Sequence, residues 1–122
     1  MTMEERKARK ADWKTEPMPS ANKVINLDLR YSAAAMSTIR RGFLPRDMDD
    51  RWFAYMEGDS LFLHRSWSGH CIFVVRFSAE DEGLRGIEAT VNQDPAQYRS
   101  DGDDADRQAI ADIIDGCFFS DE

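Results

Sequence analysis

The stretch "RWFAYMEGDSLFLHRSWSGHCIFVVRF", residues 51–77, decides the fold. Aromatic, branched and other apolar residues fill three segments of it, and aromatic and β-branched side chains favour strands. The segments are separated by "EGDS" at 57–60 and by Ser68-Gly69, where glycine and short polar residues supply turn geometry that β-branched residues disfavour. The stretch therefore predicts a three-stranded antiparallel meander.

The middle segment of this meander alternates between two faces. One face carries Leu61, Leu63, Arg65 and Trp67, and the other carries Phe62, His64 and Ser66. Because both faces hold apolar side chains, we expect both to be partly covered, one of them by helices.

Two further segments have the alternating period of a half-buried strand. "KVINLDLRY" at 23–31 predicts a short strand, and "GLRGIEATVNQD" at 83–94 predicts a fourth strand of the meander. The sheet is thus predicted as a meander of three to four antiparallel strands over residues 51–92.

Two helices are predicted to flank the sheet. Ser32 can cap a helix near 32–42, which Gly42 and Pro45 would stop. A second helix near 103–117 has apolar residues at i, i+3, i+4, i+7 and i+8, namely Ile110, Ile113, Ile114, Cys117 and Phe118. We expect its isoleucines to pack against the sheet, and successive strands with flanking helices predict an α+β fold.

The length of 122 residues favours one domain, placed at 23–119. Residues 1–22 lack apolar periodicity and contain two prolines, so they are predicted as a poorly ordered, disordered N-terminal lead-in. No apolar run approaches the roughly 20 residues that span a bilayer, and none follows the charged start. The predicted location is cytoplasmic, with no membrane partner and with both cysteines reduced.

The formal net charge of −7 marks an acidic protein, and its excess of acid lies at the C-terminal end. Residues 101–122 hold eight acidic residues and a single arginine, whereas the other hundred residues are balanced. Binding to nucleic acid requires a basic face. The composition therefore predicts no nucleic-acid partner, and the basic "ERKARK" at 5–10 is interpreted as a solvated terminus.

A resemblance is carried by "IRRGFLPRDMDDRWFAYMEGDSLFLHRSWSGHCIFVVRF" and by the later "VNQDPAQY". Over about residues 38–98 the chain resembles a family of small, uncharacterised bacterial proteins. That family shares an R/K-W-F start, an HRSW-S/T-G pattern and an N-x-D-P-x-x-Y segment. The resemblance implies a nucleotide-related role by association with proteins of ADP-ribose metabolism, and it implies no established activity.

Cysteine–histidine catalysis and metal binding are both considered for residues 64–71. Cys71 has His64 and His70 nearby in sequence, but it precedes a strand of alternating core residues and is better interpreted as a small core residue. The two histidines lack acidic residues at ligand spacing, so neither a metal nor a cofactor is predicted. The catalytic residues, if there are any, are left open.

Anion binding is the favoured functional interpretation of the basic and aromatic residues. Arginine with tryptophan suits a phosphate joined to a ring, and glycine permits close approach of a ligand. The candidate ligand-binding residues are Arg41, Arg46, Arg51, Trp52, His64, Arg65, Ser66, Trp67 and Gly69. The structural alternative is that the arginines neutralise nearby aspartates while the tryptophans fill the core.

Alternation along the strand limits which residues can share a site. Arg65 and Trp67 face one way and His64 and Ser66 the other, so we expect only one pair to line a pocket. Arg65 is expected to be substantially buried near a concave surface formed with Arg41, Arg46 or Arg51.

Two functions follow from this sequence. The first is a small cytoplasmic binding or regulatory protein with a protein partner, because the chain is short and no catalytic motif is complete. The second is a small-ligand protein or enzyme that acts on a phosphorylated nucleotide or ADP-ribose-like molecule. Whether any reaction is catalysed, and the oligomeric state, are left open.

Overall fold

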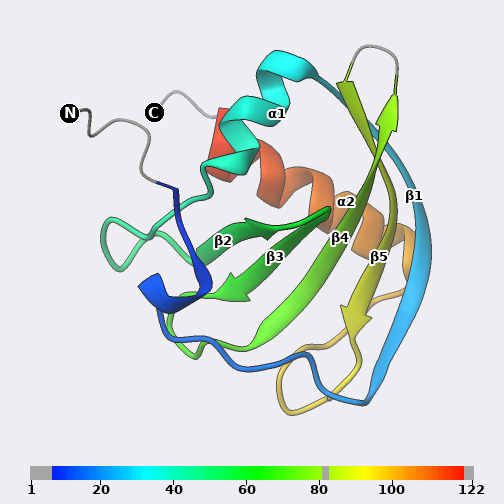
Figure 1. The fold of residues 1–122 in the computed structure, drawn as a ribbon. Helices are drawn as coiled ribbons and strands as arrows, with labels where there is room; N and C mark the ends of the chain where they lie inside the picture. Colours follow the sequence, from blue (N-terminus) through cyan, green and yellow to red (C-terminus); the bar gives the residue numbers. More distant parts are fainter. Residues whose placement is uncertain (1–6, 81–82, 120–122) are drawn as a thin grey trace.

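One five-stranded antiparallel sheet forms the centre of the computed structural model, which describes residues 7–80 and 83–119 (Figure 1). The strand order is β1-β5-β4-β3-β2. The strands are β1 (Asn22–Ser32), β2 (Trp52–Glu57), β3 (Ser60–Arg65), β4 (Cys71–Glu80) and β5 (Gly83–Asn92). The α+β class is confirmed.

The predicted number of strands was wrong, because the sheet has five strands rather than three to four. The additional strand is β1, which pairs antiparallel with β5 from Asn22 opposite Asn92 to Ser32 opposite Gly83. The alternation at 23–31 predicts a strand but not its partner, and β5 offers the edge that satisfies its backbone groups.

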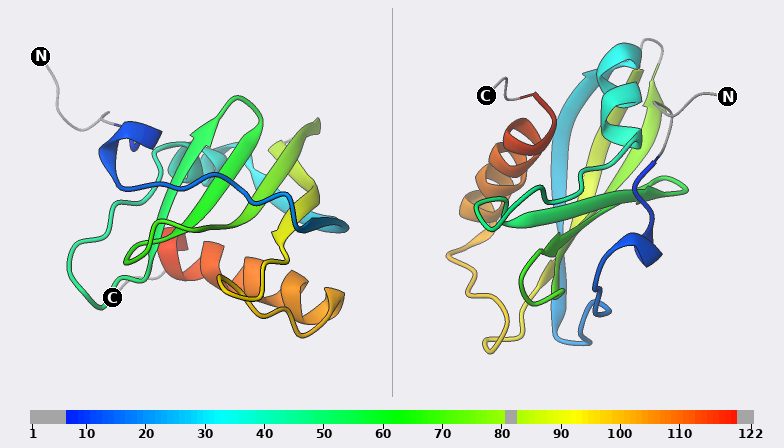
Figure 2. Two further views of the ribbon diagram at one scale, coloured as in Figure 1. Left: turned by 90° about the horizontal axis from the view of Figure 1, so that it is seen from below. Right: turned by 90° about the vertical axis from the view of Figure 1, so that its left-hand side faces the viewer.

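Two helices accompany the sheet, α1 (Ala33–Arg40) and α2 (Asp103–Ile114), and a π-helical turn at Asp115–Phe119 continues α2. Ser32 caps α1 as predicted, since its Oγ accepts a hydrogen bond from the Ala35 amide at 3.0 Å. Figure 2 shows α2 lying along one face of the sheet. Within the described ranges, no helix is long and apolar enough to cross a membrane.

The main core lies between the sheet and the helices. Ile110 and Ile114 of α2 are fully buried there, and Ile113 is partly buried against the same cluster. The isoleucine stripe therefore packs on the sheet, with Ile113 at its margin.

The N-terminal lead-in crosses the opposite face of the sheet from residue 7 onward, and includes a short 3-10 turn at Lys10–Asp12 (Figure 2). Ala8 is buried beside Phe53 and Tyr55. The Trp13 Nε1–H donates to the Ser66 carbonyl at 2.8 Å, and the Glu16 amide donates to the Gly69 carbonyl at 2.8 Å. The poor order expected for residues 1–22 stays a prediction, and residues 1–6 lie outside the described residues.

Candidate functional site

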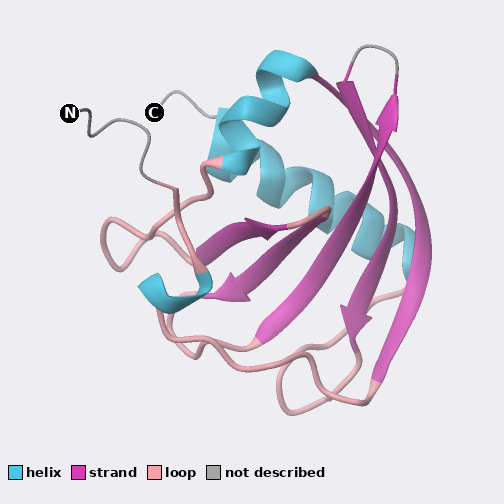
Figure 3. Ribbon diagram, viewed as in Figure 1, coloured by secondary structure: helices cyan, strands magenta, loops and turns pink. Residues whose placement is uncertain are grey.

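A concave site of about 390 Å³ lies at the open end of the β2–β3 hairpin. We call it the arginine hollow and define it by its lining residues, which are Arg51, Arg65, Trp67, Ser68 and Gln97. Its volume falls within the range of small-molecule sites. The lining comes from places where strands meet loops: the start of β2, the end of β3 with the turn after it, and the loop after β5 (Figure 3).

Strand pairing sets the position of Arg65. It lies opposite Trp52 in the β2–β3 register, and its guanidinium carbon is 4.9 Å from the centroid of the Trp52 ring. Trp52 in turn packs against Phe73 of β4. The half-buried Arg65 is thereby held by an aromatic surface, which orders the guanidinium without neutralising its charge.

Neither arginine of the hollow forms an ion pair with a described residue. Among residues 7–80 and 83–119, no carboxylate lies within ion-pair distance of Arg51 or Arg65. Arg46 is different, because its Nε lies 2.8 Å from Asp50 Oδ2, and this hydrogen bond lowers the pKa of the Asp50 carboxyl. The structural alternative thus describes Arg46 but not Arg65. Arg51 forms no ion pair with a described residue, but it also borders a second concave region that Asp49, Asp50 and Asp112 line.

Trp67 and Ser68 add a ring and a hydroxyl to the hollow. Trp67 is 64% exposed, and its Nε1–H donates to the Met48 carbonyl at 3.2 Å. Among the described residues no aromatic ring stacks on it, and most of its surface is exposed to solvent. Ser68 Oγ accepts from the His70 amide at 3.2 Å, which leaves its O–H able to donate.

His64 and Ser66 lie on the far side of the turn, where both are buried. His64 Nδ1 is 2.9 Å from the Gly69 carbonyl, which can only accept, so Nδ1 carries the proton. Burial lowers the pKa of His64 and keeps the ring neutral at pH 7. Ser66 Oγ–H donates to the Asp50 carbonyl at 2.8 Å. Of the two alternating pairs, Arg65 and Trp67 line the hollow.

Gly69 and Arg41 lie outside the hollow. Gly69 has φ +85°, and a Cβ there would lie 2.9 Å from the backbone oxygen of Lys14. The segment that approaches this glycine closely is therefore the lead-in. Arg41 is exposed at the end of α1, and its carbonyl accepts from the Ala8 amide at 2.7 Å.

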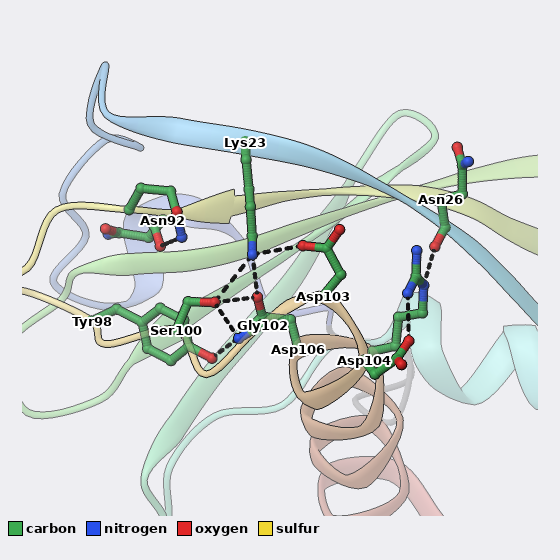
Figure 4. Close-up of polar contacts among 11 residues, drawn as sticks. Lys23, Asn26, Asn92, Tyr98, Ser100, Gly102, Asp103, Asp104 and Asp106 are labelled. Carbon is green, nitrogen blue, oxygen red and sulfur yellow. Dashed lines mark hydrogen bonds and ion pairs between the residues drawn. The ribbon is translucent and has the colours of Figure 1, made fainter.

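Gln97 completes the hollow and was not among the predicted site residues. It belongs to "VNQDPAQY", which the resemblance singled out, but the alternation of strands cannot place a residue of the loop that follows. A buried polar network holds this loop in place. Figure 4 shows Lys23 of β1 reaching toward Ser100 and Asp106.

Asp106 is the centre of that network. Its fully buried carboxylate accepts hydrogen bonds from Tyr98 Oη and Ser100 Oγ, both at 2.6 Å, and Lys23 Nζ lies 2.9 Å away. Burial opposes its ionisation, but these three partners outweigh burial and lower the pKa of Asp106. The helical pattern predicted for residues 103–117 contains no sign that this aspartate is buried.

Cys71 is a core residue. It is buried, its Sγ lies 4.0 Å from the Phe73 carbonyl, and burial raises the pKa of the thiol to about 12. A thiol in this state is a poor nucleophile at neutral pH. In the part of the chain that the structure describes, no group of three or more His, Cys, Asp and Glu side chains could hold a metal ion.

Comparisons with known proteins give no further guide to the site. A scan against protein-family models, a search of curated proteins and a search of solved structures each found no match. The resemblance carried by residues 38–98 therefore stays a prediction.

Proposed function

We propose that the protein is a binding protein for a small anionic ligand that carries a planar ring, such as a nucleotide. The observation that carries this proposal is the pair Arg51 and Arg65, which line one hollow and have no carboxylate partner among the described residues. Arg65 is half-buried, and a half-buried guanidinium without a counter-ion is costly, so an anionic ligand would relieve that cost. Arg51 is exposed and adds a second positive charge at the rim of the hollow.

The remaining lining residues fit such a ligand. Guanidinium groups bind phosphate oxygens bidentately, and the Ser68 hydroxyl can donate to the same oxygens. The exposed ring of Trp67 offers a stacking surface for a base or another flat ring. Because Trp52 already holds Arg65, less conformational entropy is lost when the ligand binds.

Binding, rather than a reaction, is the better supported role. Ser68 supplies the hydroxyl among the lining residues of the hollow, and no described basic side chain lies within hydrogen-bond distance of its Oγ. An unassisted serine hydroxyl is a weak nucleophile. The cytoplasmic location and the membership of a bacterial family remain proposals that rest on the sequence alone.

A protein partner is the second candidate. Trp67 and Met48 are 64% and 72% exposed and are joined by the bond from the indole to the Met48 carbonyl. Tryptophan and arginine are enriched among the residues that dominate binding energy at protein interfaces. A regulatory role would use this same surface.

A thermal-shift series separates the two candidates. We expect ADP, ADP-ribose and inorganic pyrophosphate to raise Tm by about 3 °C or more at saturating concentration, and adenosine to have little effect. Arg65→Gln should abolish these shifts. Arg41→Gln is the matched control and should preserve them, because Arg41 lies outside the hollow. No change in Tm with any of these compounds would contradict the ligand proposal and favour the surface around Trp67 and Met48 as a site for a protein partner.

A further inference from the structure

The orientation of the Asn92 side chain is dictated by the backbone around it. Asn92 is fully buried, with Nδ2 2.9 Å from the Cys71 carbonyl and Oδ1 2.8 Å from the Asp94 amide nitrogen. A carbonyl can only accept a hydrogen bond and an amide N–H can only donate one. The Asn92 amide can therefore satisfy both neighbours in one orientation only.

This orientation is passed on to Gln97. The second proton of Asn92 Nδ2 points to Gln97, 2.8 Å away, so the Gln97 atom that faces Asn92 must be the carbonyl oxygen Oε1. The Gln97 Nε2 group then lies at the opposite side of its amide. Across the described ranges no acceptor is within hydrogen-bond distance of Nε2, and Gln97 lines the arginine hollow.

We propose that Asn92 is a positioning residue that fixes Gln97 as a hydrogen-bond donor in the arginine hollow, so that the hollow selects ligand groups that only accept. This inference rests on the proposed function. The polar side chains of the hollow, Arg51, Arg65, Ser68 and Gln97, then all present donors. The matching ligand class is a phosphate or carboxylate, and a group that donates at the Gln97 position is rejected because two donors would face each other.

Substitutions at Gln97 test the specificity with ADP as the probe. Gln97→Glu keeps an oxygen for Asn92 but turns a carboxylate oxygen into the hollow, and we expect ADP affinity to fall about tenfold or more. Gln97→Met removes the donor without adding charge and should cause a smaller loss. Gln93→Glu is the matched control, because this substitution adds the same charge to the same loop but outside the hollow. We expect it to leave the ADP affinity close to that of the wild type. Equal ADP affinity for Gln97→Glu and wild type would overturn the inference.

Side-chain amide NMR tests the positioning role separately, in the ligand-free protein. We expect the Asn92 Nδ2 protons to be protected from exchange with water and the Gln97 Nε2 protons to exchange fast. In Asn92→Asp the new carboxylate would turn the Gln97 amide around, so the Gln97 protons become protected and ADP affinity falls several-fold. Slow exchange at Gln97 in wild type would overturn the orientation. Failure of ADP to bind wild type would instead count against the proposed function.

Discussion

Arg65 lies with its guanidinium carbon 4.9 Å from the centroid of the Trp52 ring, directly across the β2–β3 ladder. The pairing of β2 with β3 thus fixes the Arg65 guanidinium at the edge of the hollow, where its positive charge can interact with a ligand. The contact contributes about 1 kcal/mol at a partly exposed site. This is enough to order the guanidinium, but the contact supplies neither a counter-charge nor hydrogen-bond acceptors for its N–H groups.

Removal of the Trp52 ring should weaken ligand binding. We expect Trp52→Leu to lower the affinity for ADP about fivefold, because Arg65 loses the surface that holds it. Trp52→Phe retains an aromatic face and should retain most of the affinity. Calorimetric titration measures both, and equal affinities for the two variants would show that the ring does not position Arg65.

The Asp106 network should dominate the stability of the loop that carries Gln97. We expect Asp106→Asn to cost about 3 kcal/mol of unfolding free energy, because Lys23 and two hydroxyls lose their buried anion. Asp104→Asn is the matched control in the same helical turn. Asp104 is fully exposed, so its loss should cost far less stability than the loss of the buried Asp106. Urea unfolding measures both, and similar costs would contradict the assignment.

The same network predicts a pH dependence. The folded state lowers the pKa of Asp106, so its ionisation stabilises the fold above the ordinary carboxyl pKa of about 3.9. This stabilisation is lost as pH falls from that value through the lower pKa of the folded state. The stability difference between wild type and Asp106→Asn should therefore be constant near pH 7 and shrink below pH of about 4. A difference that persists unchanged at low pH would exclude this explanation.

Gly69 and Gly58 provide a matched pair for the contact with the lead-in. Both have positive φ, +85° and +61°, so alanine strains the backbone at each by about 1 kcal/mol. At Gly58 a Cβ meets nothing within 4 Å, whereas at Gly69 it lies 2.9 Å from the Lys14 backbone oxygen. Gly69→Ala should therefore destabilise the protein by about 2 kcal/mol more than Gly58→Ala in thermal or urea unfolding. Equal losses would mean that the lead-in does not pack on this turn.

The isoleucines of α2 should differ in their effect on stability. Ile114→Ala should cost about 3 kcal/mol, since Ile114 is fully buried between α2 and the sheet. Ile113→Ala should cost less than half as much, because Ile113 is only partly buried. Chemical denaturation of the two variants checks the order, and a larger loss at Ile113 would contradict the packing described.

Local patterns in the sequence predicted local structure well. The Ser32 cap, the hairpin turn at "EGDS" and the helical stripe through Ile110 and Ile114 each depend on neighbours within a few positions. The pairing of β1 with β5 was not predicted, because alternation identifies a strand but contains no information about its partner.

The candidate site was predicted only in part, for a similar reason. Arg65 and Trp67 line the hollow while His64 and Ser66 are buried. Ser66 and Trp67 belong to the turn after β3, however, so the alternation of a strand does not explain their places. Arg41 and Arg46 lie near Arg51 in sequence but do not line the hollow, whereas Gln97 lines it from a loop 32 positions after Arg65. Buried polar partners such as Asn92 and Asp106 are not recognisable in a sequence, because their burial depends on long-range packing.

The arginine hollow is tested most directly by titrating the wild-type protein with ADP while following the side-chain N–H signals of arginine and tryptophan by NMR. We expect the Nε–H signals of Arg51 and Arg65 and the indole N–H of Trp67 to shift together and saturate. The indole N–H of Trp13, bonded to the Ser66 carbonyl, should stay in place. Unchanged signals at Arg51, Arg65 and Trp67 at millimolar ADP would contradict the assignment of this hollow as the ligand site.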